Sequence, residues 1–219
     1  MDLTPDTRQQ RRPRRPAQRI WPAQARGAAV VTLGFGVLLY LIEFVDMTVF
    51  DTGLDGYGIE PRSVSGLDGV AFAPLLHGGW EHLTANTVPV LVLGFLAMAG
   101  GLRQWAAVTA TIWLVGGLGV WLTAYPNTVT IGASVLIFGW LTFLLVRGWF
   151  NRSGRQILLG ILLFLYWGGM LWGVLPGADQ VSWQGHLFGA IGGVLAAWLV
   201  SRTARPAATP VGPTFGPTV

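Results

Sequence analysis

The sequence contains no cysteine and no lysine, and only 11% of its 219 residues are charged. Without cysteine the chain can form neither a disulfide nor a thiolate metal site, and a cysteine nucleophile is excluded. The scarcity of charge accompanies 52% hydrophobic residues and 11 tryptophans, with a mean hydropathy of +0.54. Soluble domains rarely combine these values, so the composition indicates an integral membrane protein.

Six apolar stretches approach the ~20 residues that a helix needs to cross a bilayer core of ~30 Å. They cover residues 27–50, 82–101, 104–124, 131–149, 156–175 and 181–201. The first stretch is too long for a cleavable signal peptide, and no small-residue cleavage site follows it. We therefore expect an all-α membrane protein with a bundle of six transmembrane helices.

The arginines predict the direction of these helices. Seven arginines precede the first stretch, and further arginines fall between the second and third stretches, between the fourth and fifth, and after the sixth. The other connections are neutral or acidic. A basic run can also bind nucleic acid, but beside a transmembrane segment it is more often a topology signal. The positive-inside rule then places both termini in the cytoplasm.

The two ends of the chain have a different composition from its middle. Residues 1–26 are basic and broken by proline, and residues 202–219 are rich in proline, threonine and glycine. We expect both to be disordered tails around a membrane domain at 27–201. The long connection 51–81 contains apolar and aromatic residues and is expected to form short helices in the outer interface.

Strongly polar side chains inside the predicted helices are few, and they occur at similar depth. His82 and Asn86 open the second helix, Ser134 opens the fourth and His186 opens the sixth. All three helices run inward from the outer side, so the four side chains fall at one level. Polar groups in a membrane span are costly and are usually functional. The sequence therefore predicts one site built from three helices.

Each of these side chains also has an ordinary structural interpretation. A serine in a transmembrane helix commonly bonds its own backbone. An isolated histidine can serve packing or hydrogen bonding, and an asparagine can join two helices. Their shared depth favours the functional interpretation.

The spacing around His186 indicates a close neighbour. Gly189 and Gly193 follow it by three and seven residues and so share its helical face. Glycines on one face allow another helix to approach closely. Gly132 and Ala133 are likewise small, so another helix can approach the start of the fourth helix closely.

A serine within hydrogen-bond reach of a histidine is the minimum for nucleophilic catalysis. Phe138, one turn after Ser134, can lie against the imidazole ring. The tetrahedral intermediate needs donors for its oxyanion, which His82, the Asn86 amide and the Ser134 backbone N–H can supply. Asp179 belongs to the preceding outer loop, so we predict a Ser134–His186 dyad without a carboxylate.

These residues resemble the rhomboid family of intramembrane serine proteases over about residues 27–201. The segment "HGGWEHLTAN" is similar to the family's histidine-rich start of the second helix, with His77, His82 and Asn86. "GAS" at 132–134 matches G-x-S, and "GHLFGAIGG" matches H-x-x-G-x-x-x-G.

The resemblance implies the six-helix rhomboid fold, with Ser134 as nucleophile, His186 as base, and His82 and Asn86 at the oxyanion. It also implies that His77, Gly132, Val135, Phe138, Gly189 and Gly193 line the site. No metal, cofactor or nucleic acid is expected. The implied partners are the lipid bilayer and single-span membrane proteins whose helices unwind near the outer face, and the implied location is a bacterial plasma membrane.

One residue departs from the family pattern, because Val135 follows the serine where glycine is common. Its branched side chain is expected to add bulk beside the nucleophile, so Val135→Gly would raise turnover if crowding limits the site.

Three other functions remain open. The chain can be a catalytically silent rhomboid relative that binds transmembrane helices, a proton-coupled transporter or a metalloprotease. A transporter should show paired acidic residues within its helices, and only Glu43 and Asp46 of this chain lie within a predicted helix. A metalloprotease lacks H-E-x-x-H.

Overall fold

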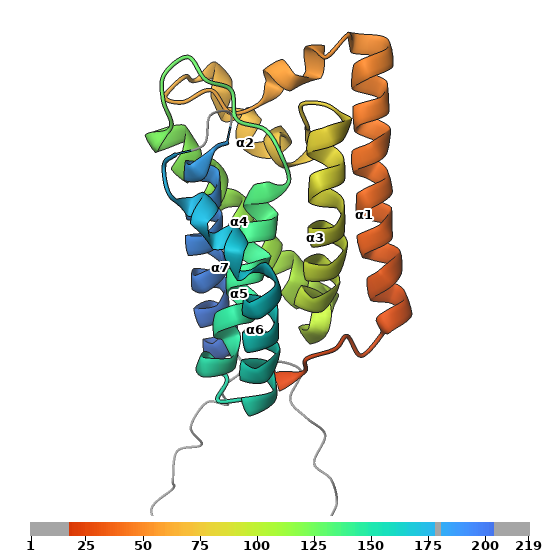
Figure 1. Ribbon diagram of the computed structural model, residues 1–219, viewed down its shortest axis with the longest axis vertical. Helices are drawn as coiled ribbons and strands as arrows, with labels where there is room; N and C mark the ends of the chain where they lie inside the picture. Colours follow the sequence, from red (N-terminus) through yellow and green to blue (C-terminus); the bar gives the residue numbers. More distant parts are fainter. Residues whose placement is uncertain (1–17, 178–180, 204–219) are drawn as a thin grey trace, which may run out of the picture.

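A computed structural model of the chain describes residues 18–177 and 181–203. The long helices are α1 (Ala25–Val45), α3 (Trp80–Ala97), α4 (Leu102–Thr123), α5 (Ser134–Phe150), α6 (Gly154–Trp167) and α7 (Trp183–Thr203). They form one bundle in which α1 stands at the edge beside α3 (Figure 1). We call the end with residues 51–81 the upper end and the opposite end the lower end.

Several of the long helices continue into tighter or wider turns. A π-helical turn (Asp46–Phe50) extends α1, and a 3₁₀ segment (Gly168–Val174) extends α6. Between α1 and α3 the chain forms short 3₁₀ turns and the one-turn helix α2 (Gly69–Phe72), which lie across the upper end. The expected short helices in this connection are therefore present.

Five of the helices in the described part of the chain are long and apolar enough to cross a membrane. The remaining apolar helix, α5, has 17 residues, which corresponds to ~26 Å at 1.5 Å per residue. It is shorter than the ~30 Å bilayer core. These lengths are those of membrane-spanning helices, and the expected sixth span depends on α5.

Helix α5 forms the centre of the bundle. Most of its side chains are buried, and Leu136, Leu141, Phe143 and Leu144 have no exposed surface. Small residues bring α7 against it, because a Cβ atom at Gly189 would overlap the carbonyl oxygen of Val135. The hydroxyl of Thr142 donates to the carbonyl of Ala190 at 2.9 Å across the same contact. The glycines near His186 thus permit the backbone contact that their spacing predicts.

Some predictions fall on residues that are not described. The tails lie mostly at 1–17 and 204–219, and Asp179 lies within 178–180, so the structure does not test them. Helix α1 begins at Ala25 and α7 ends at Thr203.

Candidate active site

Ser134 is the first residue of α5, and the connection 51–81 holds the loop that leads to it. Ile59 and Thr130 exchange backbone hydrogen bonds of 3.0 and 3.1 Å. Closer to the serine, Gly132 donates its N–H to the carbonyl of Ala73 at 2.8 Å. Residues distant in sequence therefore fix the loop before Ser134 at the upper end.

Gly132 brings the His82 ring beside this loop. Its φ of +120° is a conformation that residues with side chains rarely adopt. A Cβ atom at Gly132 would lie 2.8 Å from Cε1 and 2.9 Å from Nε2 of His82, and 3.8 Å from Oγ of Ser134. The hydroxyl and His82 Nε2 therefore border the same position, which only glycine leaves free.

The backbone partner of His82 determines which of its ring nitrogens carries hydrogen. Gly78 donates its N–H to His82 Nδ1 at 3.3 Å, so Nδ1 is the unprotonated nitrogen. In the neutral ring Nε2 then bears the hydrogen, and Nε2 is the atom near Gly132. His82 is thus prepared to donate a hydrogen bond beside Ser134.

Asn86 lies on the same face of α3, one turn after His82, and is buried. Its amide nitrogen donates to the carbonyl of His82 at 2.8 Å. One amide hydrogen is thus engaged within its own helix, while the second remains available to a ligand.

His77 supports the loop that leads to Ser134. It is 1% exposed, and its Nε2 accepts the N–H of Ala133 at 3.4 Å. Its ring meets the ring of His82 edge-on, with centroids 5.1 Å apart. Burial, and then the neighbouring His82 ring, lower the pKa of His77 from 6.5 to about 4.

This depressed pKa predicts a loss of stability in acid. The unfolded chain binds a proton at His77 below pH 6.5, whereas the folded chain does so only near pH 4. The stabilisation is fully present above pH 6.5 and is lost as the pH falls to 4, by roughly 3 kcal/mol. The measurement is the free energy of unfolding in detergent from pH 7.5 to 4.

His77→Gln is the control for this titration, because it keeps an acceptor for Ala133 but does not titrate. The variant should lose less stability in acid than the wild type, since His82 and His186 titrate in both proteins. Parallel pH curves would contradict the assignment.

His186 lies on α7, and its ring faces α5. The ring stacks on Phe138 with centroids 4.0 Å apart and planes 7° apart, as the position of Phe138 one turn after Ser134 predicts. His186 Nδ1 lies 3.0 Å from the carbonyl oxygen of Gly173. A carbonyl can only accept, so Nδ1 carries the hydrogen and Nε2 keeps the lone pair.

Ser134 and His186 therefore occupy the same side of the α5–α7 contact. Phe138 connects them, since it shares a helical face with Ser134 and stacks on His186. In this structure the two side chains are not hydrogen-bonded to each other. Catalytic hydrogen bonds often tighten only when substrate is bound.

Val135 does not point into this site. Its Cγ2 atom fills the space that a Cβ atom at Gly116 of α4 would occupy, and the side chain is 9% exposed. The expected crowding beside the nucleophile is therefore replaced by a packing role between α4 and α5.

We accordingly expect Val135→Gly to destabilise the protein rather than to raise turnover. The change leaves a cavity against Gly116 and adds backbone entropy to the unfolded chain, at a cost of about 2–3 kcal/mol. Thermal unfolding and cleavage rate, measured on the same preparation, test this. Higher turnover at unchanged stability would instead support crowding.

Sequence reasoning missed the backbone groups that orient the histidines. The backbone groups of Gly173 and Gly78 contact the histidine rings, and that of Ala73 contacts the loop before Ser134. Carbonyl and N–H groups are common to nearly all residue types, so the sequence gives no signal of their role. A weak signal exists at Gly173, where a Cβ atom would lie 3.0 Å from Nδ1 of His186 and 3.1 Å from Cζ of Phe138. Among the described residues no group of three or more acidic or histidine side chains is arranged to hold a metal.

Comparisons with known proteins identify the family of this chain. The Rhomboid domain profile matches residues 67–203. An uncharacterised protein of Mycobacterium tuberculosis is 47% identical over 212 residues, which are 93% of this chain and 84% of that protein. An uncharacterised protein of Mycobacterium leprae is 48% identical over 184 residues, which are 80% of this chain and 72% of the relative.

A more distant relative has a name that states a function. The Rhomboid-like protease 5 of Toxoplasma gondii is 31% identical over 141 residues, which are 61% of this chain and 16% of that protein. The profile match covers more than half of the chain, and it includes all three histidines and Ser134. The chain therefore belongs to the rhomboid family of integral membrane proteins.

Proposed function

We propose that this rhomboid is an intramembrane serine endopeptidase in which Ser134 is the nucleophile and His186 the base. The observation that carries the proposal is the placement of the His186 ring. The ring stacks on Phe138, one turn from Ser134, while Nδ1 is engaged by the Gly173 carbonyl. Nε2 is thereby left with a free lone pair and can act as a base.

The first chemical step uses this free lone pair. His186 Nε2 accepts the hydroxyl proton of Ser134 as Oγ bonds to the carbonyl carbon of the scissile peptide. The resulting imidazolium carries a positive charge, which the Gly173 carbonyl stabilises through the Nδ1 hydrogen bond. This carbonyl takes the orienting role that a carboxylate has in a triad, consistent with the predicted dyad.

The negative charge on the substrate oxygen requires donors on the opposite side. His82 Nε2–H and the second amide hydrogen of Asn86 are suited to this role. The N–H of Ser134 is one of the unpaired donors at the start of α5, where the helix dipole also favours negative charge. Together they form the proposed oxyanion hole.

Collapse of the intermediate breaks the peptide bond. The imidazolium returns the proton to the leaving amine, and the acyl group remains on Ser134 Oγ. His186 then deprotonates a water molecule that attacks this ester, and the serine hydroxyl is restored. The upper end of the bundle must therefore admit water to Ser134.

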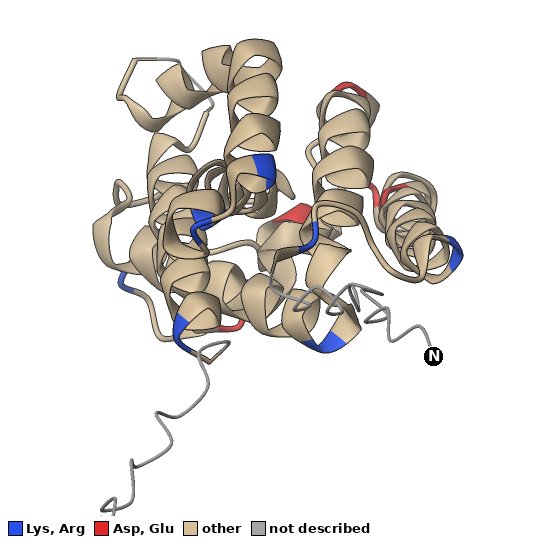
Figure 2. Cartoon of the chain, turned by 90° about the horizontal axis from the view of Figure 1, so that it is seen from below, with Lys and Arg blue, Asp and Glu red and all other residues tan. Residues whose placement is uncertain are grey.

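We infer six membrane spans with both termini cytoplasmic. The described arginines on helix ends and turns of the lower end are Arg19, Arg26, Arg103, Arg147, Arg152, Arg155 and Arg202. Figure 2 views the molecule from below, and arginines are spread over that end. The positive-inside rule then places the site on the outer side of the membrane. The mycobacterial relatives favour a bacterial plasma membrane as its location.

The short α5 is compatible with a sixth span. Its first residue is Ser134, so the nucleophile lies at the start of the helix rather than along it. Gly132 and Ala133, directly before Ser134, are buried, and the loop is held by backbone hydrogen bonds to Ala73 and Ile59. Irregular backbone is tolerated at membrane depth where protein buries it.

The substrates proposed are single-span membrane proteins whose helices unwind near the outer face. The test is a panel of such proteins incubated in liposomes with the wild-type chain and with Ser134→Ala. A protease yields cleaved products with the wild type only. A catalytically silent rhomboid, the second candidate, would bind members of the panel equally well in both forms and yield no product.

A further inference from the structure

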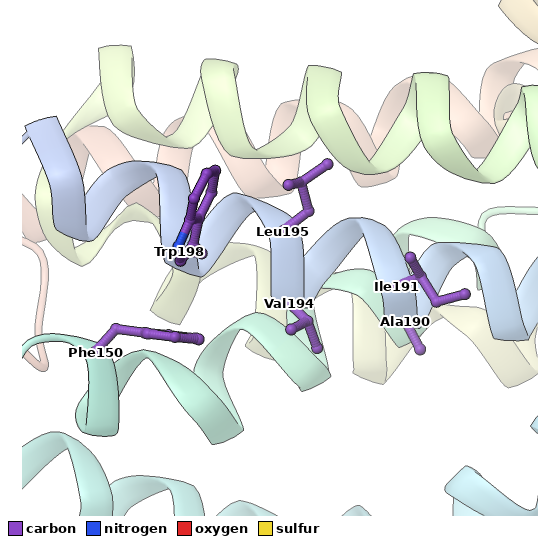
Figure 3. A pocket seen from close by; sticks show the side chains of 6 residues that line it. All are labelled: Phe150, Ala190, Ile191, Val194, Leu195 and Trp198. Carbon is purple, nitrogen blue, oxygen red and sulfur yellow. The ribbon is translucent and has the colours of Figure 1, made fainter.

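The surface between α5 and α7 contains an apolar groove near the lower end. Its lining residues are Phe150, Ala190, Ile191, Val194, Leu195 and Trp198 (Figure 3). The groove has a volume of about 490 Å³. Four of the α7 side chains, Ile191, Val194, Leu195 and Trp198, are 36–45% exposed, so the groove is open to the surroundings of the bundle.

We propose that this groove binds one acyl chain of an anionic phospholipid, whose phosphate is held by Arg202. The six lining side chains present an apolar surface to the groove, to which no charged group contributes. Inside a bilayer an unfilled groove loses dispersion contacts along its whole wall. A flexible hydrocarbon chain restores these contacts.

The small residues of α7 argue against a transmembrane helix as the occupant. Tight helix pairs in membranes use glycine or alanine stripes to bring backbones together. Gly189 and Gly193 face α5, and Gly192 faces Ile112 of α4. The groove side of α7 instead presents the bulky Ile191, Val194, Leu195 and Trp198.

A cation stands at the lower end of the groove. The guanidinium of Arg202 lies 4.1 Å from the ring centroid of Trp198, which lines the groove. Stacking uses the face of the guanidinium and leaves its edge N–H groups free to bind an anion. Arg202 is exposed, and it forms no ion pair with a described residue.

The surrounding charges select an anionic ligand. The described acidic residues, Glu43, Asp46, Asp51, Asp55, Glu60, Asp68 and Glu81, belong to the end of α1, the connection 51–81 and the start of α3, all at the upper end. The lower end therefore presents only arginines among its described charged residues. A lipid phosphate bound bidentately to Arg202, with its acyl chain beside Trp198, fits both the apolar groove and the cationic lower end.

Native mass spectrometry of the detergent-purified full chain tests this proposal. The probes are phosphatidylglycerol and phosphatidylcholine with identical acyl chains, and inorganic phosphate as the headgroup without a chain. We expect phosphatidylglycerol to bind at least fivefold more tightly than phosphatidylcholine, and inorganic phosphate to show no binding. Tight binding of inorganic phosphate alone would overturn the role of the groove.

Variants separate the two halves of the site. Arg202→Gln should reduce phosphatidylglycerol binding to the level of phosphatidylcholine, and Val194→Trp, which fills the groove, should weaken both lipids. Arg26→Gln, at the lower end of α1 and remote from α7, should change neither. Equal losses of lipid binding in Arg202→Gln and Arg26→Gln would indicate only diffuse electrostatic attraction. Unchanged lipid binding in Val194→Trp would exclude the groove. Either result overturns the proposal.

Discussion

Replacing His186 by alanine is expected to lower the rate of substrate cleavage by about 10⁴-fold or more. The change removes the base proposed for Ser134, and triad serine proteases lose rates of this order when the histidine is removed. The measurement is single-turnover cleavage of a substrate found in the liposome panel. Residual activity reports the contribution of the oxyanion donors alone.

Phe138→Leu is the matched control for this experiment. It removes the stacked ring that holds His186 but keeps the imidazole and its Gly173 partner. We expect a loss of about tenfold or less, since an aromatic pair contributes about 0.5–1.5 kcal/mol. If His186→Ala retained more than a tenth of the wild-type rate, His186 would not be the base.

Adding one methyl group at Gly189 is expected to damage both fold and activity. A Cβ atom there overlaps the carbonyl oxygen of Val135, which follows the nucleophile. Two backbones must separate to admit it, at a cost of about 2–3 kcal/mol. The separation also withdraws His186 from Ser134, so we expect at least a tenfold lower cleavage rate in the fraction that remains folded.

Gly34→Ala offers the same chemical change without the overlap. Gly34 lies within α1, and its added methyl group would meet no atom within 4 Å. Alanine should stabilise this helix by up to about 1 kcal/mol. Thermal unfolding and cleavage rates of the two variants are compared; similar behaviour would show that the α5–α7 contact does not require glycine at 189.

The sequence predicted those parts of the site that depend on helical spacing. Polar residues at one depth on three helices are rare, and Phe138 follows Ser134 by one turn, so spacing alone is enough to group these residues. The close approach of α7 followed in the same way from Gly189 and Gly193. The helical period of 3.6 residues determines which residues share one face of a helix, and the faces determine which side chains can meet.

The parts that were missed depend on backbone groups and loops. The Gly173 carbonyl, the Gly78 N–H and the pairing of Ile59 with Thr130 fix ring orientation and loop position. These backbone groups act through the path that the chain follows, which the residue types alone do not specify. The packing of Val135 was not foreseen for a related reason, because it depends on the space that Gly116 leaves on another helix.

The central claim, that His186 activates Ser134, is tested most directly with a fluorophosphonate probe that reacts covalently with nucleophilic serines. The labelling rate and the labelled peptide are determined for the wild type, Ser134→Ala and His186→Ala in detergent. We expect modification of Ser134 in the wild type, none in Ser134→Ala and at least a hundredfold slower labelling in His186→Ala. Labelling of another serine, or an undiminished rate without His186, would contradict it.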